Sequence, residues 1–425
     1  MHIWQYMAMI LFCCLLISCT NQQTTENSLL DVQKKTLIVN LFYTGELLGE
    51  LEPCGCSGGK LGGMLLRSGW IDHLRKEYPD LFLLDGGFAA KNWDRQDHLK
   101  FSVHRNTLHV LKYNLQFLHE KESLPPNLEC PDTPKLLSIN DELGSLYHYE
   151  KWTQNELSLG ILFLAMEKNM PLNKEKFQRA VQEYNPEIVF IVTKGIYTGY
   201  DSLVPEGKFL RIFFPVDSPA PYSPLEPSPG ILVISAGNKG RYAGIFSIEL
   251  TNQQTISWKN SIISLEKQYD ANPQIETLLD QYTDTLEQER LLDFVIKRSS
   301  PIGFIGTENC IECHQNEYKI WQMTKHAHAF QTLVDVKHHY DPECVGCHVI
   351  GFEYEEGFRS IDDTDYLINV GCEACHGPGA EQAMNPVAGF GKHDKKPVCL
   401  TCHEKDRSPN FNYEEFREKI RHWQD

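Results

Sequence analysis

Four short motifs in the last third of the chain each combine two cysteines with a histidine. Each has the form Cys-x-x-Cys-His, and in chain order we call them the first to fourth motifs. The two thiols of such a motif can form thioether bonds to one haem, and the adjacent imidazole can bind the haem iron. The eight thiols belong to Cys310, Cys313, Cys344, Cys347, Cys372, Cys375, Cys399 and Cys402, and the four imidazoles to His314, His348, His376 and His403.

Paired cysteines also occur in zinc sites and in disulfides. A zinc site has no reason to place a histidine directly after every Cys-x-x-Cys pair. A disulfide does not need the histidine either. Because all four pairs carry it, the sequence predicts four covalently bound haem c groups.

An iron with six ligands needs a second axial ligand besides the motif histidine. Six further histidines follow the first motif and form four groups, so one group could serve each haem. We expect ligands at His326, His339, His393 and His422, with His328 and His338 as the neighbouring members of two near-adjacent pairs.

The segment that carries the motifs, residues 301–425, is short for four haems. It offers about 31 residues to each, too few for an ordinary core, so the haems themselves should form the core. Without them this segment should not fold, as in other small metallo-domains. It contains 12 Lys and Arg against 21 Asp and Glu, a net charge of −9. This acidity favours a redox partner with a basic face. The whole chain, at −17, is unsuited to a nucleic-acid partner.

Residues 306–422 resemble the tetrahaem cytochrome c-554 family. The likeness is carried by Lys-His-Ala-His-Ala at 325–329, Cys-His-Val-Ile-Gly-Phe at 347–352 and Val-Gly-Cys-Glu-Ala-Cys-His-Gly-Pro-Gly at 370–379. The resemblance implies an electron carrier outside the cytoplasmic membrane whose haems mostly have two axial histidines. It also implies that His326 is a ligand. A few relatives are redox enzymes that act on small nitrogen compounds.

One position departs from that family. Similar sequences often place a histidine three residues after the Gly-Pro-Gly turn, whereas this chain has Gln382. Either His393 substitutes for it, or one iron is left open.

The chain upstream of the motifs alternates between apolar strands and amphipathic helices, which predicts an α/β sheet domain. The strands are expected at 36–43, 81–85, 159–165, 187–193, 230–235 and 243–250, the helices at 65–78 and 173–184, Pro-rich loops at 123–134 and 215–229, and a long connecting helix at 272–297.

Residues 36–265 resemble the metallophosphoesterase domain of secreted 5′-nucleotidases. The resemblance rests on the first strand, Gly62-Gly63, residues 83–87 and the glycine-rich stretch 235–244. The resemblance implies an α/β sandwich, joined here to a small, mainly helical domain packed around haem.

The metal ligands of that family are missing. Its first strand is followed by Asp-x-His, but here by residues 44–46, Thr-Gly-Glu, and its Gly-Asp is replaced by Gly87-Phe88. The chain has no histidine between His148 and His314. Asp85 and Glu46 alone cannot hold two metal ions, so we expect a scaffold or docking platform without phosphohydrolase activity.

Three cysteines lie between the N-terminal region and the motifs. Cys54 and Cys56, with or without Cys130, could form a soft-metal or redox site. Alternatively, Cys130 forms a structural disulfide with one of the pair. A disulfide between Cys54 and Cys56 would be strained. The sequence does not separate these alternatives.

The first residues predict export. The apolar run 7–17 is 11 residues long, whereas a membrane-spanning helix needs about 20, so it fits the core of a signal peptide. Residues 16–19, Leu-Ile-Ser-Cys, resemble the lipobox of bacterial lipoproteins, which implies that Cys19 is lipidated. No Lys or Arg precedes the run, and an ordinary cleaved signal or a short anchor is the alternative.

The predicted organisation is a signal peptide (1–18), a tether (19–35), a degenerate phosphoesterase-like domain (36–265), a connecting helix (266–300) and a tetrahaem cytochrome domain (301–425). We interpret the protein as a cytochrome held to a membrane by lipid only, on the periplasmic or outer-surface side. Two other functions remain open. One is a redox enzyme in which an open haem binds a small inorganic substrate, and the other is a nucleotide hydrolase with an appended cytochrome.

Overall fold

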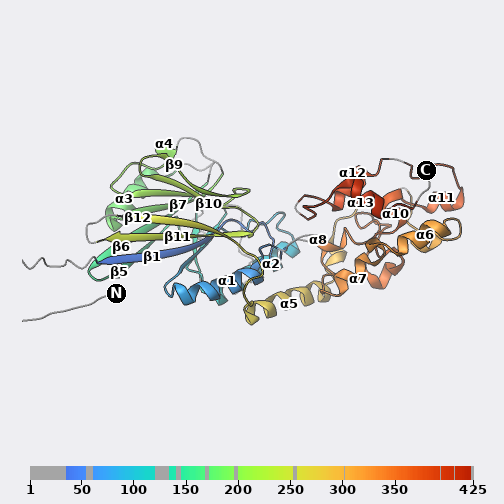
Figure 1. Ribbon diagram of the computed structural model, residues 1–425, viewed down its shortest axis with the longest axis horizontal. Helices are drawn as coiled ribbons and strands as arrows, with labels where there is room; N and C mark the ends of the chain where they lie inside the picture. The colour runs from blue at the N-terminus through green and yellow to red at the C-terminus, as the bar shows by residue number, and fades with distance from the viewer. Residues whose placement is uncertain are drawn as a thin grey trace, which may run out of the picture.

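The structure is a computed structural model with a strand-rich N-terminal part and a helical C-terminal part joined by helix α5 (Figure 1). It describes residues 35–53, 61–119, 134–139, 145–167, 172–195, 200–251, 256–300, 302–392, 394–405 and 407–422. Five residues singled out above lie outside this description, so the predictions for them stay predictions. They are Cys19, Cys54, Cys56, Cys130 and His393.

The strands form two sheets of six. The first has the order β12-β11-β1-β2-β3-β4, and the second the order β5-β6-β7-β8-β10-β9. The first sheet consists of β1 (Thr36–Thr44), β2 (Phe82–Asp85), β3 (Leu115–Leu118), β4 (Lys135–Ser138), β11 (Tyr242–Thr251) and β12 (Ile256–Ser264). The second consists of β5 (Tyr147–Gln154), β6 (Leu157–Glu167), β7 (Ile188–Lys194), β8 (Leu210–Pro215), β9 (Pro221–Ser228) and β10 (Ile231–Ala236).

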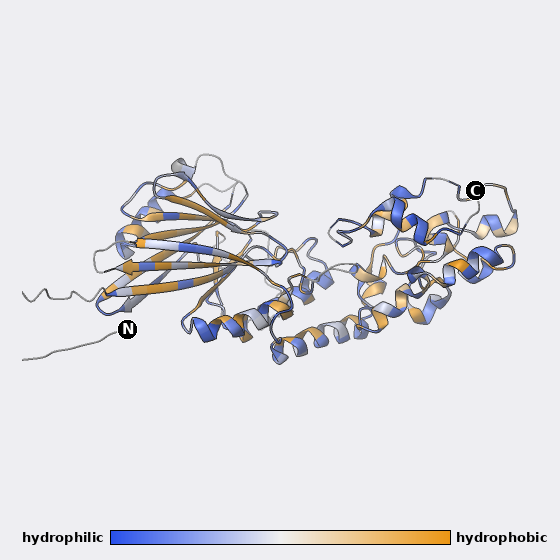
Figure 2. Cartoon of the chain, in the orientation of Figure 1, coloured by the Kyte–Doolittle hydropathy of each residue, from blue (hydrophilic) through white to orange (hydrophobic). Residues whose placement is uncertain are grey.

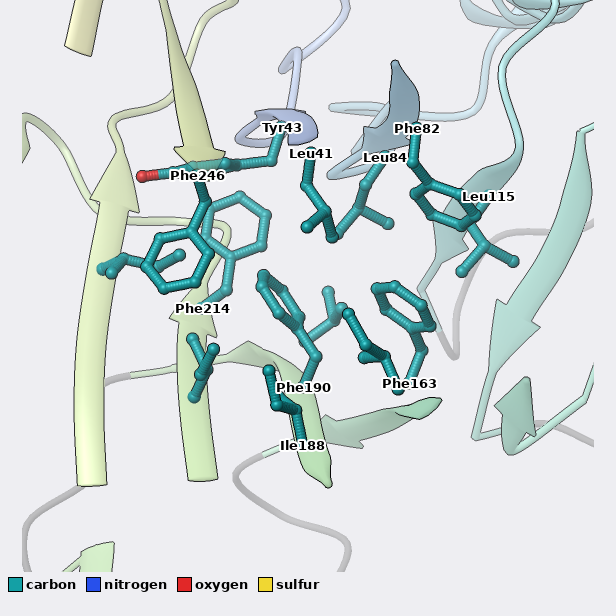
Figure 3. Close-up of a cluster of buried hydrophobic side chains, with 14 of the residues drawn as sticks. Leu41, Tyr43, Phe82, Leu84, Leu115, Phe163, Ile188, Phe190, Phe214 and Phe246 are labelled. Carbon is teal, nitrogen blue, oxygen red and sulfur yellow. The ribbon is translucent and has the colours of Figure 1, made fainter. Parts of the chain in front are cut away.

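The core lies between the two sheets, where large side chains from both meet (Figure 3). Phe82 of the first sheet stacks on Phe163 of the second with ring centres 5.1 Å apart. Tyr43 meets Phe214 edge to face at 4.9 Å. Both faces of the central parallel strands are covered, which explains why they are apolar almost throughout.

Helices cover the outer faces. The helices α1 (Met64–Glu77), α2 (Arg95–Val110) and α5 (Pro273–Gln288) pack on the first sheet, and α3 (Lys174–Tyr184) and α4 (Tyr200–Leu203) pack on the second. The fold is therefore an α/β sandwich with its two sheets inside, which confirms the predicted class for this part of the chain.

Two predicted elements need correction. The helix expected over 272–297 ends at Gln288, because Arg290 adopts a left-handed backbone (φ 49°) before the short turn η1 (Leu291–Phe294). The expected loop 215–229 contains β9, whose prolines are tolerated because it pairs on one side only, at the sheet edge.

The C-terminal part is built from short helical segments. They are η2 (Thr307–Cys310), α6 (Gln315–Gln322), η3 (Lys325–His328), α7 (Ala329–Val334), α8 (Pro342–Val345), α9 (Ile361–Thr364), η4 (Asp365–Leu367), α10 (Cys372–His376), α11 (Ala380–Met384), α12 (Lys396–Cys402) and α13 (Tyr413–Lys419). An apolar cluster surrounds α7, α8 and the end of α5. By contrast, α6, α11, α12 and α13 bury none of their residues. Figure 2 shows hydrophilic and hydrophobic residues alternating along the helices of this part. These four helices therefore lack a polypeptide core to pack on.

The two parts meet through a polar junction between α2 and the second motif. The Gln96 amide donates to the Tyr282 hydroxyl (3.0 Å) and to Asp341 (2.8 Å), and all three side chains are buried. Lys100 forms an ion pair with Glu343 at 2.7 Å. Within the described ranges, no helix combines the length and apolar character needed to cross a membrane.

Candidate haem sites

Each motif lies on a helical turn or directly after one. The third motif is the whole of α10, and the fourth ends α12. Backbone hydrogen bonds close the turns, for example from His314 N to Cys310 O (3.0 Å) and from His403 N to Cys399 O (2.9 Å). Because residues three apart share one side of a helix, both thiols of a motif can reach the same ligand.

Cysteines from different motifs lie against one another. Cys310 lies close enough to Cys372 for the two thiols to shift each other's pKa, and so does Cys347 to Cys402. The third and fourth motifs also lie close enough for Cys399 to influence the charge of Cys375. The motifs therefore follow one another in space in the order first, third, fourth, second.

Two motif imidazoles face a second histidine. The ring centres of His403 and His326 are 6.3 Å apart, and those of His376 and His422 are 5.9 Å apart. Imidazole nitrogens bind a metal at about 2.0 Å, so two imidazoles on opposite sides of one ion have ring centres roughly 6 Å apart. Both pairs therefore fit an iron with two axial histidines.

The other ring nitrogens have protein partners. The Nδ1 atom of His348 lies 2.6 Å from Ala329 O, that of His422 lies 2.9 Å from Ile420 O, and that of His403 lies 3.0 Å from Ser408 Oγ. Such bonds fix the ring and leave Nε2 for a metal. Burial lowers the pKa of His348 and His403, which favours the neutral form that binds metals.

The remaining histidines lie elsewhere. His339 packs against Phe330 and Tyr340, and among the described residues its buried Nδ1 has no hydrogen-bond partner. His328 Nε2 lies 3.2 Å from Gln322 O. These contacts bring neither histidine against a motif imidazole.

His338 lies at the junction between the two parts. It forms ion pairs with Glu52 at 2.9 Å and Asp341 at 3.2 Å. The ligand atoms of His338, Asp341 and Cys344 lie within 4.8 Å of one another, as metal ligands do. A cysteine that has formed a thioether no longer supplies a thiolate, so a metal here and a haem on the second motif exclude each other.

Gln382, at the position where similar sequences have histidine, closes a turn. Its amide donates to Val387 O (3.2 Å) and accepts from Val387 N (3.0 Å). Both ends of the amide are therefore engaged, and the side chain serves the local backbone.

A buried carboxylate inside the third motif ties several segments together. Glu373 is 4% exposed and accepts hydrogen bonds from the backbone N–H groups of Ile305, Gly306 (2.7 Å) and Gly379 (2.6 Å). Charge-assisted bonds of this kind are the stronger class. Glu373 thereby holds the approach to the first motif beside the Gly-Pro-Gly turn. The sequence reasoning missed this role, and the only signal was a carboxylate inside the motif.

At the carboxyl end of the first sheet, Asp85 is occupied by protein cations. It pairs with Arg67 at 2.8 Å and His104 at 3.3 Å, all three side chains being fully buried. It also accepts a hydrogen bond from Gly87 N (3.0 Å). Burial alone would raise the pKa of Asp85, but the neighbouring His104 and Arg67 side chains outweigh it and lower the pKa to about 2.

Glu46 is neutralised in the same way. It pairs with Lys194 at 2.7 Å and His119 at 3.8 Å, and His119 also pairs with Glu167 at 3.2 Å. Burial by itself lowers the pKa of His119, but hydrogen bonds to Glu167 and Glu46 raise it to about 9. These two carboxylates, like Asp85, are held by side chains rather than left open for a metal.

Sequence reasoning named Asp85 and Glu46 but none of their partners. Arg67 and His104 come from α1 and α2, and His119 and Lys194 from the ends of β3 and β7. No spacing along the chain relates them. They meet because the two sheets pack face to face and the helices α1 and α2 pack on the first sheet, which brings all of these elements together at the carboxyl ends of the strands.

Comparison with known proteins gives two kinds of likeness, one by structure and one by sequence. Among solved structures, similar folds include the calcineurin-like phosphoesterase YfkN of Bacillus subtilis (14% identity, TM-score 0.44, covering 59% of this chain and 98% of that one). They also include the NAD nucleotidase of Haemophilus influenzae (13% identity, TM-score 0.49, covering 78% of this chain and 75% of that one). A third is a 5′-nucleotidase precursor of Thermus thermophilus (14% identity, TM-score 0.46, covering 71% of this chain and 68% of that one).

The C-terminal part has relatives by sequence. Cytochrome c-554 of Nitrosomonas europaea is 36% identical over 130 residues, which cover 26% of this chain and 54% of the relative. This chain thus spans about half the length of that relative. Residues 309–377 match the family model described as cytochrome c554 and c-prime. The C-terminal part of the chain therefore contains a c-type cytochrome segment, which implies covalently bound haem.

Proposed function

We propose that the protein is a lipid-anchored c-type cytochrome with four haems that transfers electrons outside the cytoplasmic membrane. The observation that carries the proposal is the facing of His403 with His326 and of His376 with His422, at ring distances that suit one iron between each pair. An iron with both axial positions filled by imidazole exchanges electrons without binding a substrate. This arrangement suits a carrier better than an enzyme.

In this proposal each part of the site has a defined task. The eight motif thiols anchor the haems, and each motif histidine supplies one axial ligand. His326 and His422 supply the second ligand at the fourth and third motifs, and His339 and His393 are proposed for the other two. The haem irons, when bound, supply reversible one-electron oxidation and reduction. Glu373 positions the backbone around the first and third motifs through its hydrogen bonds.

A multihaem redox enzyme is the second candidate. Within the described part of the chain, ring contacts pair only two of the four motif imidazoles with another histidine, and Gln382 is held by Val387. An iron left open in this way could bind a small inorganic nitrogen compound. The spin state of the irons separates this candidate from the carrier.

We propose that the N-terminal domain has no phosphohydrolase activity and serves as a scaffold for the cytochrome part. The ion pairs of Asp85 with Arg67 and of Glu46 with Lys194 support this role. A metal ion would have to compete with a buried guanidinium and a lysine for these carboxylates. The proposed redox partner presents a basic face to the acidic cytochrome domain.

Replacing His326 tests the assignment of axial ligands. We expect His326→Ala to convert one low-spin haem to high spin and to create carbon monoxide binding at about one haem in four, because one iron loses its sixth ligand. His328→Ala, two residues away, is the matched control and should leave the spectrum unchanged. Paramagnetic resonance and absorption spectra of the holoprotein measure both effects. An unchanged spin state in His326→Ala, or the same change in His328→Ala, would refute the assignment.

Replacing Cys19 tests the lipid anchor. The wild type should partition with membranes until its acyl chains are removed. More than one chain is expected, because a single myristoyl chain binds membranes only marginally, with a binding constant of about 10⁴ M⁻¹. Cys19→Ala should be released from the membrane fraction or be misprocessed. A soluble wild type cleaved at another residue would contradict the lipoprotein proposal.

Acidification tests the buried Asp85 pair. Because folding lowers the pKa of Asp85 from 3.8 to about 2, the stabilisation is complete above pH 4 and is lost as the pH falls towards 2. At pH 7 Asp85→Asn should lower the free energy of unfolding by about 3–5 kcal/mol, because Arg67 remains buried without its counter-charge. Below pH 4 the difference in free energy of unfolding between the wild type and Asp85→Asn should become smaller.

The control for this experiment is Asp80→Asn, since Asp80 is exposed and lies on the same domain. It should change the free energy of unfolding by less than about 0.5 kcal/mol. Denaturant unfolding of the holoprotein followed by circular dichroism gives both values. If the difference in free energy of unfolding between the wild type and Asp85→Asn grew below pH 4, the Asp85 carboxylate would not be stabilised by this pair.

A further inference from the structure

The four motifs form a row whose two ends differ. Hydrogen bonds link the segment of the first motif to that of the third, the third to the fourth, and the fourth to the second. Cys372 N donates to Thr307 Oγ1 at 3.2 Å, Lys395 donates to Cys375 O at 2.8 Å, and Arg407 donates to Cys347 Sγ at 3.7 Å. The first and second motifs are therefore the ends of the row.

The N-terminal domain covers the second-motif end. Asp341, which caps α8 directly before this motif, is 5% exposed and accepts a hydrogen bond from Gln96 of α2. Glu343 pairs with the buried side chain of Lys100 on the same helix. Glu52 reaches His338 from the loop after β1. Polar groups of the sandwich thus contact both sides of the segment that leads into Cys344.

The first-motif end faces solvent. Three charged side chains beside the first motif, Glu308, Glu312 and Lys319, are exposed. The following helix, α6, buries none of its residues. Figure 1 places α6 on the side of the cytochrome part away from the sandwich, whereas α8 lies beside α2.

The two middle motifs are covered by the C-terminal segment. The ring of His403 stacks on Phe411 with centres 4.4 Å apart, and Phe416 meets it edge to face at 5.7 Å. The ring of His376 lies 5.9 Å from that of His422. Of the four motifs, the first therefore offers the most open approach to a protein-sized partner.

We propose that the N-terminal domain is a cap on the second-motif end of the row. This inference rests on the proposed electron-carrier function. Partner proteins then exchange electrons at the other end, on the surface formed by residues 307–322. The partner is a one-electron redox protein with a basic face. This surface carries Glu308, Glu312 and Glu317 against Lys319, within a cytochrome region of net charge −9. Opposite charges at such a contact steer encounter and fix orientation.

The test measures binding rather than turnover. The probe is a basic monohaem cytochrome c whose iron is replaced by zinc, which makes it redox-inert, and it is titrated against the full-length holoprotein at low ionic strength. Reversing two exposed charges with Glu308→Lys and Glu312→Lys should weaken binding by roughly tenfold. The matched control is Asp335→Lys with Glu355→Lys, two exposed carboxylates on the same part of the chain but outside this surface. The control should change affinity by less than about twofold, because these charges lie outside the contact and the attraction between charges falls with distance.

Hydrogen exchange of the complex locates the contact. Protection is expected within residues 307–322 and not in α2 or α8. Equal weakening by the control pair, protection at α2 or α8, or no binding of the probe at low ionic strength would each overturn the assignment of this surface. Oxidation of the dithionite-reduced holoprotein by hexaammineruthenium(III) separates this inference from the proposed function. If the reduced haems give electrons to this small complex while the contact lies elsewhere, only the assignments of the cap and of the docking surface are wrong. If dithionite reduces no haem, or the reduced haems give no electrons to the complex, the carrier function itself fails.

Discussion

The closeness of cysteines from different motifs is the constraint on which the C-terminal part depends. Because Cys310 lies near Cys372, and Cys347 lies near Cys402, groups attached to these motifs must lie close together. The polypeptide around them need not provide an ordinary core, and α6, α11, α12 and α13 bury no residue of their own. Short hydrogen-bonded connections, above all those of Glu373, hold the backbone in place around this centre.

The sandwich contributes a different kind of stability. Its core is a conventional one, with aromatic side chains of two sheets packed against each other. At the edge where its strands end, Arg67 and Lys194 neutralise the carboxylates of Asp85 and Glu46. The domain can therefore be rigid without a metal ion. A rigid domain fixed to α8 through Gln96 and Lys100 is well suited to hold the cytochrome part in one orientation.

Features set by neighbouring residues in the sequence were predictable. Contacts between residues that the fold brings together from distant parts of the chain were not. The apolar runs predicted β1, β6 and β7 nearly to their ends, whereas the assignment of His326 and His422 as iron ligands stays a prediction. By contrast, Arg67 and His104 reach Asp85 from different helices, so no spacing reveals them. The helix expected to reach residue 297 stopped early because Arg290 takes a left-handed conformation, which an amphipathic pattern does not record.

The central claim is that four haems are attached to this chain and that most of their irons have two histidine ligands. Intact-mass spectrometry of the purified holoprotein, combined with its absorption in alkaline pyridine, counts covalently bound haem directly. The account predicts four haems per chain, each attached through the two cysteines of one motif. Fewer than four haems in fully matured protein, or a motif that carries zinc or a disulfide in place of haem, would contradict it.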